Sequence, residues 1–392
     1  MERSAVIVSA LRTPVGKMRQ SLASVPAMEL AAEVIRASIQ RTGIDPAQVD
    51  EVVYGNLMNY DNGSPARMAW LTAGLPLEVP GVSVERRCAS SLAALSLAAA
   101  LVESGHAEVV LAGGVDSYSQ QPFLVKRPEQ AYPGGLQVLN VRRSPENIGD
   151  VSMIQTAENL AERYSITREA CDAFALRSHR LAAQAWQKGR FDDQVVPVSV
   201  PRKKGEAVTV TMDDCVRADC TLEALARLKP VNGAGGVVTA GNSSPMNDGA
   251  SAMLVMSRDR AEREGLEPLG TVTAFASAGC HPHYMGYGPV AATEKLMKQT
   301  GLALKDFDLI EINEAFAAQS LACLKVMGLD NEDDMARINV NGGAIAIGHP
   351  NAASGGILTA RILYEMKRRQ ARRGLITFCI GGGQGMSLVV ER

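Results

Sequence analysis

Aromatic residues, long apolar runs and an excess of one charge are all scarce in this chain of 392 residues. No apolar stretch approaches the roughly 20 residues that span a bilayer, and the N-terminal MERSAVIVSALRTP lacks a long apolar signal core. Forty basic residues oppose 42 acidic ones, and the net charge of −2 argues against broad attraction to nucleic acid. We therefore expect a cytoplasmic enzyme with neither a membrane nor a nucleic acid as partner.

Cysteine and histidine are also sparse. Seven scattered cysteines, an odd number, argue against a disulfide framework and favour free thiols in a reducing compartment. The CHPH cluster at 280–283 resembles a metal site, but four adjacent residues cannot easily surround one ion. No metal is therefore predicted.

What the chain does have is a regular alternation. Short β-rich runs alternate with alanine-rich amphipathic stretches, among them predicted helices over 27–43 and 88–105 that close on glycine. This alternation predicts a layered α/β fold with helices covering a sheet.

An internal repeat refines this prediction. The segment 41–56 aligns without a gap to 299–314, and each is a helix end, a Thr-Gly, a short linker and a strand. In each half a turn with a reactive side chain, a helix, a strand and a Gly-Gly then follow, so that LAGG at 111–114 corresponds to the glycine run near the C-terminus. We infer two similar α/β halves whose equivalent turns face each other.

The middle of the chain breaks the pattern and is interpreted as an inserted loop domain. The predicted division is 1–117 plus 248–268 for the N-terminal half, 118–247 for the insertion and 269–392 for the C-terminal half.

Cys88 is the first candidate for chemistry. It follows a β-rich run and begins a predicted helix, whose positive N-terminal end would lower the pKa of the thiol and favour a nucleophilic thiolate. The alternative is a buried structural cysteine, which is the commoner role of a single Cys.

His349 and Asn313 are further candidates. His349, one of five histidines, lies in a turn lined by glycine and alanine that would let a ligand approach the ring, although a lone histidine is usually structural. Asn313 lies where a predicted strand meets a helix, which suits an N-cap, a polar group at the carboxyl end of a strand, or both.

The run GLITFCIGGGQGMSLVV at 374–390 carries Cys379 and then four glycines within the five residues 381–385. It has no Lys-Ser/Thr for a P-loop and does not match G-x-G-x-x-G in register, which argues against a nucleotide loop. A tight glycine hairpin stays open as the alternative to a loop built around a reactive thiol.

Taken together, CASSL, NEAFAAQ, NGGAIAIGHP and CIGGGQG resemble the thiolase signatures in their usual order, over essentially the whole chain. The resemblance implies two β/α halves packed as five layers, α-β-α-β-α, with an inserted loop domain that binds coenzyme A and makes oligomer contacts. It also implies acyl transfer with CoA as a substrate and with no tightly bound cofactor.

The same resemblance implies roles for individual residues. Cys88 would carry the acyl group, His349 would activate it and Cys379 would move a proton at the acetyl-CoA methyl carbon. Asn313 would hold a water at the enolate oxygen, and Gly381 would contribute a backbone N–H to the oxyanion hole. The residues expected to bind the substrate or CoA are Ser244, Met285, Phe316 and Met153.

The leading hypothesis is thiolytic cleavage of a 3-oxoacyl-CoA, as in fatty-acid β-oxidation. The alternatives are a biosynthetic acetoacetyl-CoA thiolase and a non-catalytic lipid-binding relative. A homodimer or homotetramer and a complex with other β-oxidation enzymes are also expected. Ala352 and Ile154 stand where the family usually has glycine, which leaves the acyl chain length open.

Overall fold

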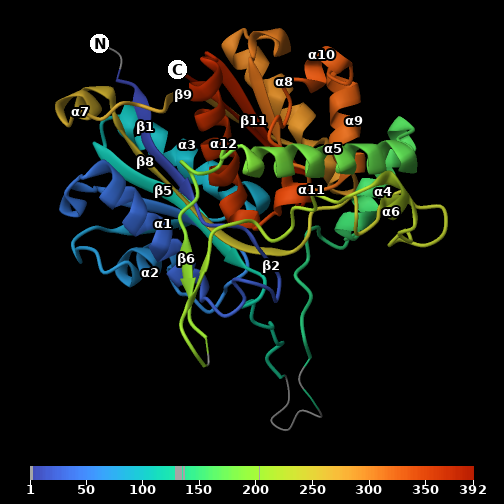
Figure 1. Cartoon of the computed structure of the whole chain (residues 1–392), viewed down its shortest axis with the longest axis horizontal. Coiled ribbons are helices and arrows are strands. Elements are labelled where there is room, and N and C mark those ends of the chain that lie inside the picture. Colours follow the sequence, from blue (N-terminus) through green and yellow to red (C-terminus); the bar gives the residue numbers. More distant parts are fainter. Residues whose placement is uncertain (1–2, 129–134, 136, 203) are drawn as a thin grey trace.

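The computed structural model describes residues 3–128, 135, 137–202 and 204–392. Its centre is a mixed sheet of ten strands, in which β2 pairs with β8 beside the path β10-β11-β12-β9-β1-β8-β5-β3-β4 (Figure 1). Strands β6 and β7 form a separate pair. The strands are β1 (Ala5–Arg12), β2 (Gly16–Lys17), β3 (Glu51–Gly55), β4 (Gly81–Val84), β5 (Val109–Ser117), β6 (Val198–Val200), β7 (Val208–Val210), β8 (Asn247–Ser257), β9 (Gly270–Gly279), β10 (Leu309–Ile312), β11 (Arg373–Ile380) and β12 (Gln384–Glu391).

The large sheet has two halves of the same topology. In the first half β3 pairs parallel with β5, and β5, β8 and β1 then follow antiparallel. In the second half β10 pairs parallel with β11, and β11, β12 and β9 follow antiparallel. The halves meet where β1 and β9, which hold the same place in each, pair over two residues. This arrangement confirms the two similar halves.

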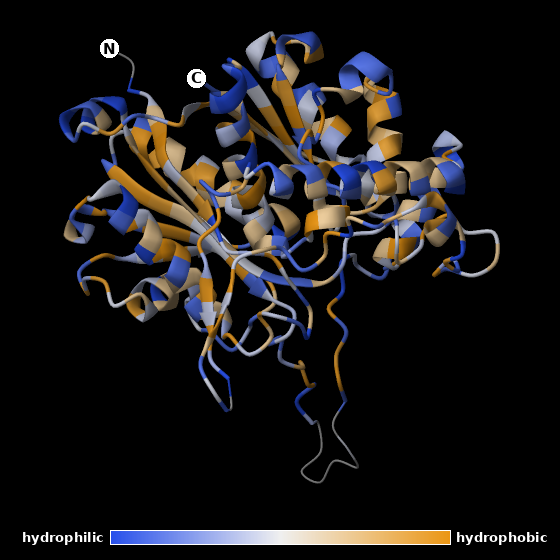
Figure 2. Cartoon of the chain, in the orientation of Figure 1, coloured by the Kyte–Doolittle hydropathy of each residue, from blue (hydrophilic) through white to orange (hydrophobic). Residues whose placement is uncertain are grey.

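Helices complete five layers, α-β-α-β-α. Helices α1 and α2 cover the outer face of the first half, α8 and α9 cover that of the second, and α3 and α12 lie between the halves. Apolar residues line the strands and the helix sides that face them, and polar ones the outer sides (Figure 2). The α-helices are α1 (Ala27–Thr42), α2 (Pro65–Thr72), α3 (Ser90–Glu103), α4 (Met153–Tyr164), α5 (Arg168–Gln187), α6 (Leu222–Ala226), α7 (Arg258–Arg263), α8 (Gly288–Thr300), α9 (Ala317–Met327), α10 (Glu332–Met335), α11 (Ala344–Ile347) and α12 (Ser354–Arg369).

Local sequence explains why the two halves match. Helix α1 ends at Gly43 with φ 68°, and α8 ends at Gly301 with φ 73°, a left-handed conformation that glycine adopts at little cost. A 3₁₀ turn follows at the same repeat position in each half, η1 (Pro46–Gln48) and η4 (Leu304–Asp306). The predicted alignment of the two segments is therefore confirmed down to the turn.

The two central helices, α3 and α12, are rich in small residues because they pack closely between the two halves. Almost every residue of α12 is buried, and a Cβ on Gly355 would lie 2.4 Å from the backbone nitrogen of Leu92 in α3. Such a contact is tolerated only by glycine. The sequence ASGG at the start of α12 is thus required by packing as well as by the turn that precedes the helix.

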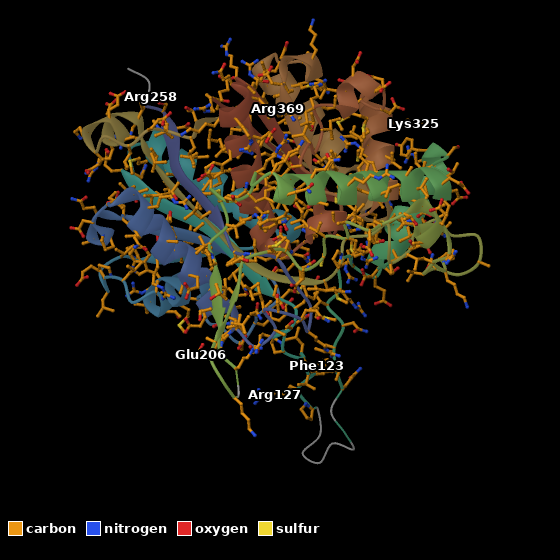
Figure 3. The ribbon with its side chains drawn as sticks, in the orientation of Figure 1. Phe123, Arg127, Glu206, Arg258, Lys325 and Arg369 are labelled. Atoms are coloured by element: carbon orange, nitrogen blue, oxygen red, sulfur yellow. The ribbon has the colours of Figure 1, made fainter. Side chains whose placement is uncertain are left out.

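The segment between β5 and β8 leaves the large sheet. Its helices α4 and α5 pack on the second half, with α5 lying across it (Figure 1), and two extended stretches project from the body. Phe123 and Arg127 lie on one of these stretches (Figure 3). Strand β8 begins at Asn247, the predicted last residue of the insertion, whose boundaries and CoA-binding role stay predictions. Within the described ranges, none of the helices has the length and apolar character needed to cross a membrane.

Candidate active site

The five predicted catalytic residues lie in turns or at strand ends of the two halves. Cys88 lies in the 3₁₀ turn η2 (Arg87–Ala89) before α3, and His349 lies just before the equivalent turn η5 (Asn351–Ala353) and α12. Asn313 directly follows β10, Cys379 is near the end of β11, and Gly381 opens the turn to β12. Equivalent turns of the two halves therefore supply the candidate site, as open α/β sheets commonly do.

Cys88 differs from the prediction in two respects. It precedes α3 in a 3₁₀ turn, and the helix itself begins two residues later at Ser90. Burial raises the pKa of Cys88 to about 11, although a hydrogen bond from the Gly381 backbone and the charge of Arg87 act in the opposite direction. The expected lowering of the thiol pKa is thus wrong, because desolvation of the thiolate outweighs the helix end. At rest this sulfur is a thiol and needs a base.

The hydrogen bonds around His349 define which of its ring nitrogens can accept a proton. Nδ1 lies 2.6 Å from Ser354 Oγ, and the Ser354 hydroxyl donates its proton to the Pro350 carbonyl at 2.9 Å. Ser354 Oγ must therefore accept a hydrogen bond from a protonated Nδ1, which leaves Nε2 unprotonated and able to accept. Burial lowers the pKa of His349 to about 4, so the ring is neutral at ordinary pH.

Asn313 lies beside this acceptor. Its Nδ2 is 3.5 Å from His349 Nε2, and its backbone N–H is held by Thr377 O in β11. The side-chain Oδ1 is buried and has no partner among the described residues. The N-cap interpretation is wrong, because α9 begins at Ala317 with Phe316 as its N-cap. The amide instead presents a free acceptor next to the imidazole.

The glycine run is a tight hairpin that also serves the site. Ile380 pairs with Gln384, and Gly382 and Gly383 turn the chain with φ of 92° and 86°. The backbone N–H of Gly381 hydrogen-bonds to the Cys88 sulfur. The hairpin alternative for this stretch is therefore confirmed, and a reactive role for its thiol stays a prediction.

Cys379 is the second thiol of the site. It is 1% exposed, and burial raises its pKa well above the ordinary value, with a further rise caused by Cys88 nearby. Cys379 is therefore protonated at rest and has a proton to give.

The register of the strands corrects one detail of the repeat. Gly113 and Gly114 pair within β5 at the positions that Thr377 and Phe378 occupy in β11. The LAGG glycines are therefore inside a strand, and the glycine run corresponds to the residues that follow β5. The LAGG glycines have a packing reason of their own, since a Cβ on Gly114 would lie 2.1 Å from the Ala352 carbonyl oxygen.

The residues expected to bind the substrate gather around Cys379. Met285 is buried against Cys379 and Ala315, and Met153 and Phe316 pack on the same cluster. Ser244 joins them through its backbone N–H and hydroxyl, which both donate to the Ala315 carbonyl. An apolar wall next to a thiol suits the thin pantetheine and acyl chains of a CoA ester.

Three positioning residues escaped the sequence analysis. Ser354 fixes the His349 ring, and Asn247 Oδ1 accepts the His349 backbone N–H at 2.8 Å. Asp116, fully buried at the end of β5, accepts the Ala352 backbone N–H at 2.7 Å and so ties the His349 turn to the first half. Only Ser354 gave a signal in the sequence, a hydroxyl five residues after a candidate histidine; the other two pairings join residues more than 100 positions apart.

Comparison with known proteins decides the family. The family models for the thiolase N-terminal and C-terminal domains match residues 5–259 and 266–392. The chain belongs to the thiolase family.

Named relatives span the full chain. The acetyl-CoA acetyltransferase of Cupriavidus necator is 45% identical over 99% of both chains. The beta-ketoadipyl-CoA thiolase of Pseudomonas knackmussii is 44% identical over 100% of both chains. The solved structure of human mitochondrial 3-ketoacyl-CoA thiolase superposes with a TM-score of 0.93 at 36% identity, covering 99% of each chain. These relatives share the thiolase fold with this chain but bear names that imply different substrates.

Proposed function

We propose that this thiolase transfers acyl groups between CoA and a 3-oxoacyl-CoA by a ping-pong route through an acyl-Cys88 intermediate. The observation that carries the proposal is that the turn η2 with Cys88 packs against β11, which carries Cys379, and against η5, which closely follows His349. Both sulfurs are protonated thiols, and the neutral histidine has an acceptor at Nε2. A nucleophile, a base for it and a separate acid are the groups that breaking a carbon–carbon bond next to a thioester requires.

In the first half-reaction Cys88 attacks the 3-oxo carbon while His349 Nε2 takes its proton. The bond between carbons 2 and 3 breaks, and the electron pair forms the enolate of acetyl-CoA. The imidazolium Nε2–H and a water bound at Asn313 would stabilise the enolate oxygen, since the amide Oδ1 there lacks a partner among the described residues. Cys379 then gives its proton to the enolate carbon.

In the second half-reaction the two thiols and the histidine return to their starting protonation states. The Cys379 thiolate takes the proton of an incoming CoA, whose sulfur attacks the acyl-Cys88 thioester. The backbone N–H groups of Cys88 and Gly381 would hold the oxyanion, a type of interaction typically worth about 3 kcal/mol per donor. Cys88 leaves as a thiolate and recovers its proton from His349, which closes the cycle.

Acyl-enzyme trapping tests this division of roles. After incubation with an acyl-CoA, intact-protein mass spectrometry should show the acyl adduct on the wild type and on Cys379→Ala, and none on Cys88→Ala. Thiolysis should be lost in both variants. A folded Cys379→Ala protein that forms no adduct would refute the assignment, as would thiolysis by Cys88→Ala.

The substrate is proposed to be a 3-oxoacyl-CoA, and a biosynthetic condensation of two acetyl-CoA molecules is the alternative. Initial rates with free CoA and acetoacetyl-CoA, longer 3-oxoacyl-CoA and 3-oxoadipyl-CoA would separate them. Absence of thiolysis with all of these would favour the third alternative, a non-catalytic lipid-binding protein.

The carboxylate-ended substrate is included because of Arg87. This residue has a left-handed φ of 44° directly before the nucleophile, and its Cδ lies 3.3 Å from the place where a Cβ on Gly381 would be. Its guanidinium makes no hydrogen bond to the described residues, and an arginine in that state suits a terminal carboxylate. If Arg87 selects such substrates, Arg87→Leu should lower kcat/KM for 3-oxoadipyl-CoA more than for acetoacetyl-CoA.

CoA is proposed to lie along the inserted segment, with its pantetheine arm past Ser244, Phe316, Met285 and Met153 to Cys88. Ser244 is half-buried and has a second lone pair left for a ligand donor while its hydroxyl is bonded to Ala315. Ser244→Ala should raise the KM for CoA with little change in kcat. An unchanged KM would place the pantetheine elsewhere.

An oligomer is proposed as well, a homodimer or a homotetramer in which the projecting stretches meet another copy. Phe123 is 83% exposed, and Val125 and Val138, which bridge the two stretches, are 46% and 57% exposed. Apolar side chains exposed together are typical of a protein interface. Light scattering on wild type and Phe123→Ser would test this, with a smaller assembly expected for the variant.

Seven free cysteines support the cytoplasmic location, and a complex with other β-oxidation enzymes stays part of the proposal.

A further inference from the structure

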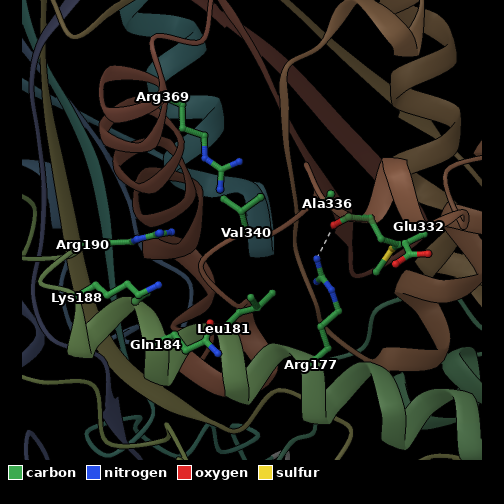
Figure 4. A pocket seen from close by; sticks show the side chains of 11 residues that line it. Arg177, Leu181, Gln184, Lys188, Arg190, Glu332, Ala336, Val340 and Arg369 are labelled. Carbon is green, nitrogen blue, oxygen red and sulfur yellow. Dashed lines mark hydrogen bonds between the residues drawn. The ribbon is translucent and has the colours of Figure 1, made fainter.

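A cavity of about 430 Å³ lies on the side of α5 that faces α10 and the end of α12. Figure 4 shows Lys188, Arg190 and Arg369 at one end of it, and Arg177 and Glu332 at the other. None of the proposed catalytic or CoA-binding residues lines it. The cavity is therefore separate from the reaction, and its volume falls in the range of small-molecule sites.

Positive charge is in excess at the first end. Glu365 is the acidic partner there, and three guanidinium groups share it: Arg369 at 2.6 Å, Arg368 at 2.9 Å and Arg190 at 3.7 Å. Lys188 forms no ion pair with the described residues. A second carboxylate, that of Asp192, lies beside Gly189. Two carboxylates do not neutralise four cations, so this end attracts an anion.

Arg177 adds an incompletely bonded donor at the other end. Its Nη2 donates to the carbonyls of Met335 at 2.6 Å and Ile338 at 2.8 Å. Its Nη1 is buried and has no partner among the described residues. Arg177 thus brings a positive charge to this end of the cavity, held in place by two backbone carbonyls, while its covered Nη1 does not face a ligand.

The remaining lining indicates the shape of the ligand. Leu181 and Val340 form an apolar floor between the two ends, and Gln184 and Glu332 offer polar groups at the rim (Figure 4). An inorganic anion would use only the cationic end. An organic body would also cover the apolar floor and donate hydrogen bonds to Glu332.

We propose that this cavity binds a small organic phosphate, with the phosphate on Lys188, Arg190 and Arg369 and a hydroxyl- or amine-bearing body over Leu181 towards Arg177 and Glu332. Arginine forks match phosphate oxygens in pairs, and a lysine adds a point charge. The proposal does not depend on the substrate of the catalytic site.

Calorimetric titration of the full chain tests it, with saturating CoA present so that the proposed CoA site is filled. The probes are AMP, ribose 5-phosphate and inorganic phosphate. At least one organic phosphate should bind no less than tenfold more tightly than inorganic phosphate. Lys188→Glu should weaken that binding at least tenfold, and Leu181→Trp, which fills the floor but keeps the charges, should abolish it.

The matched control is Lys298→Glu, which makes the same charge change on exposed α8 and should leave binding within twofold. Three results would overturn the proposal: no binding of either organic phosphate, equal affinity for inorganic phosphate, which indicates an adventitious ion only, or binding that neither cavity variant changes. Because Lys188 and Leu181 lie outside the catalytic site, thiolysis by both variants verifies that they fold.

Discussion

Removing one hydroxyl, that of Ser354, is expected to disable the base of this thiolase without touching a reacting atom. Ser354 Oγ accepts the proton on His349 Nδ1 and donates to the Pro350 carbonyl. In Ser354→Ala the Nδ1–H would be left buried without an acceptor. The ring escapes this cost by moving its proton to Nε2, where it can no longer accept one from Cys88.

The magnitude follows from the cost of the lost bond. Leaving a buried donor unpaired costs about 1–3 kcal/mol, so the tautomer with a proton on Nε2 becomes favoured by up to that amount. Each 1.36 kcal/mol corresponds to a factor of ten in rate, and kcat should therefore fall by roughly 5- to 150-fold. KM for CoA should change little, because the tautomer does not alter the proposed pantetheine contacts.

The assay is the initial rate of thiolysis over a range of CoA concentrations, together with the rate of Cys88 acylation in a single turnover. Thr359→Val is the matched control, since the Thr359 hydroxyl donates to Gly355 O at 2.8 Å in the same buried helix but does not contact His349. Both variants lose a bond from a hydroxyl to a backbone carbonyl, and only Ser354→Ala also loses the bond to His349. If Ser354→Ala and Thr359→Val have kcat values within twofold of each other, the tautomer argument is wrong.

Three further predictions concern pH and packing. The pKa of His349 is lowered to about 4, so kcat/KM should fall only as the pH drops through about 4. Stability to urea should decline from pH 6.5 towards 4, because the ring binds a proton more readily in the unfolded chain than in the folded one. A fall in kcat/KM near pH 6.5 would contradict this prediction. Asp116→Asn would set an amide donor against the Ala352 N–H, which should lower the free energy of unfolding in urea by about 1–3 kcal/mol. It should also lower kcat, because the turn that carries His349 shifts. An unchanged unfolding free energy and kcat would show that Asp116 does not hold this turn in place. Gly55→Ala would place a Cβ 2.6 Å from Ser90 Cβ and should cost about 1–3 kcal/mol or prevent folding, whereas a wild-type melting temperature would disprove the close packing.

Much of the fold was predictable because the chain contains its pattern twice. Helix α1 begins at Ala27 and closes on Gly43 as predicted from spacing and the cap. The alignment of the two halves predicted equivalent short linkers, and both linkers form 3₁₀ turns in the structure. Local signals of this kind act within a few residues and therefore survive without knowledge of the tertiary structure.

What failed depended on the surroundings of a residue. The pKa of Cys88 was expected to fall because a helix follows it, but the sequence cannot show how much protein covers the sulfur, and burial decides the direction. Asp116 and Asn247 escaped notice because their partners near His349 are more than 100 residues away. Candidate nucleophiles can thus be predicted from local motifs, whereas the groups that position them require the structure.

The repeat also explains why each half supplies different chemistry. The strand registers show that Gly55 of the first half is equivalent to Asn313 of the second, and that Val115 is equivalent to Cys379. Gly55 has no room for a side chain because α3 presses on it. In the first half the position equivalent to Asn313 therefore cannot carry an amide, and the position equivalent to Cys379 carries no thiol. The duplicated fold thus has an asymmetric candidate site, to which the first half contributes Cys88 and the second half Cys379.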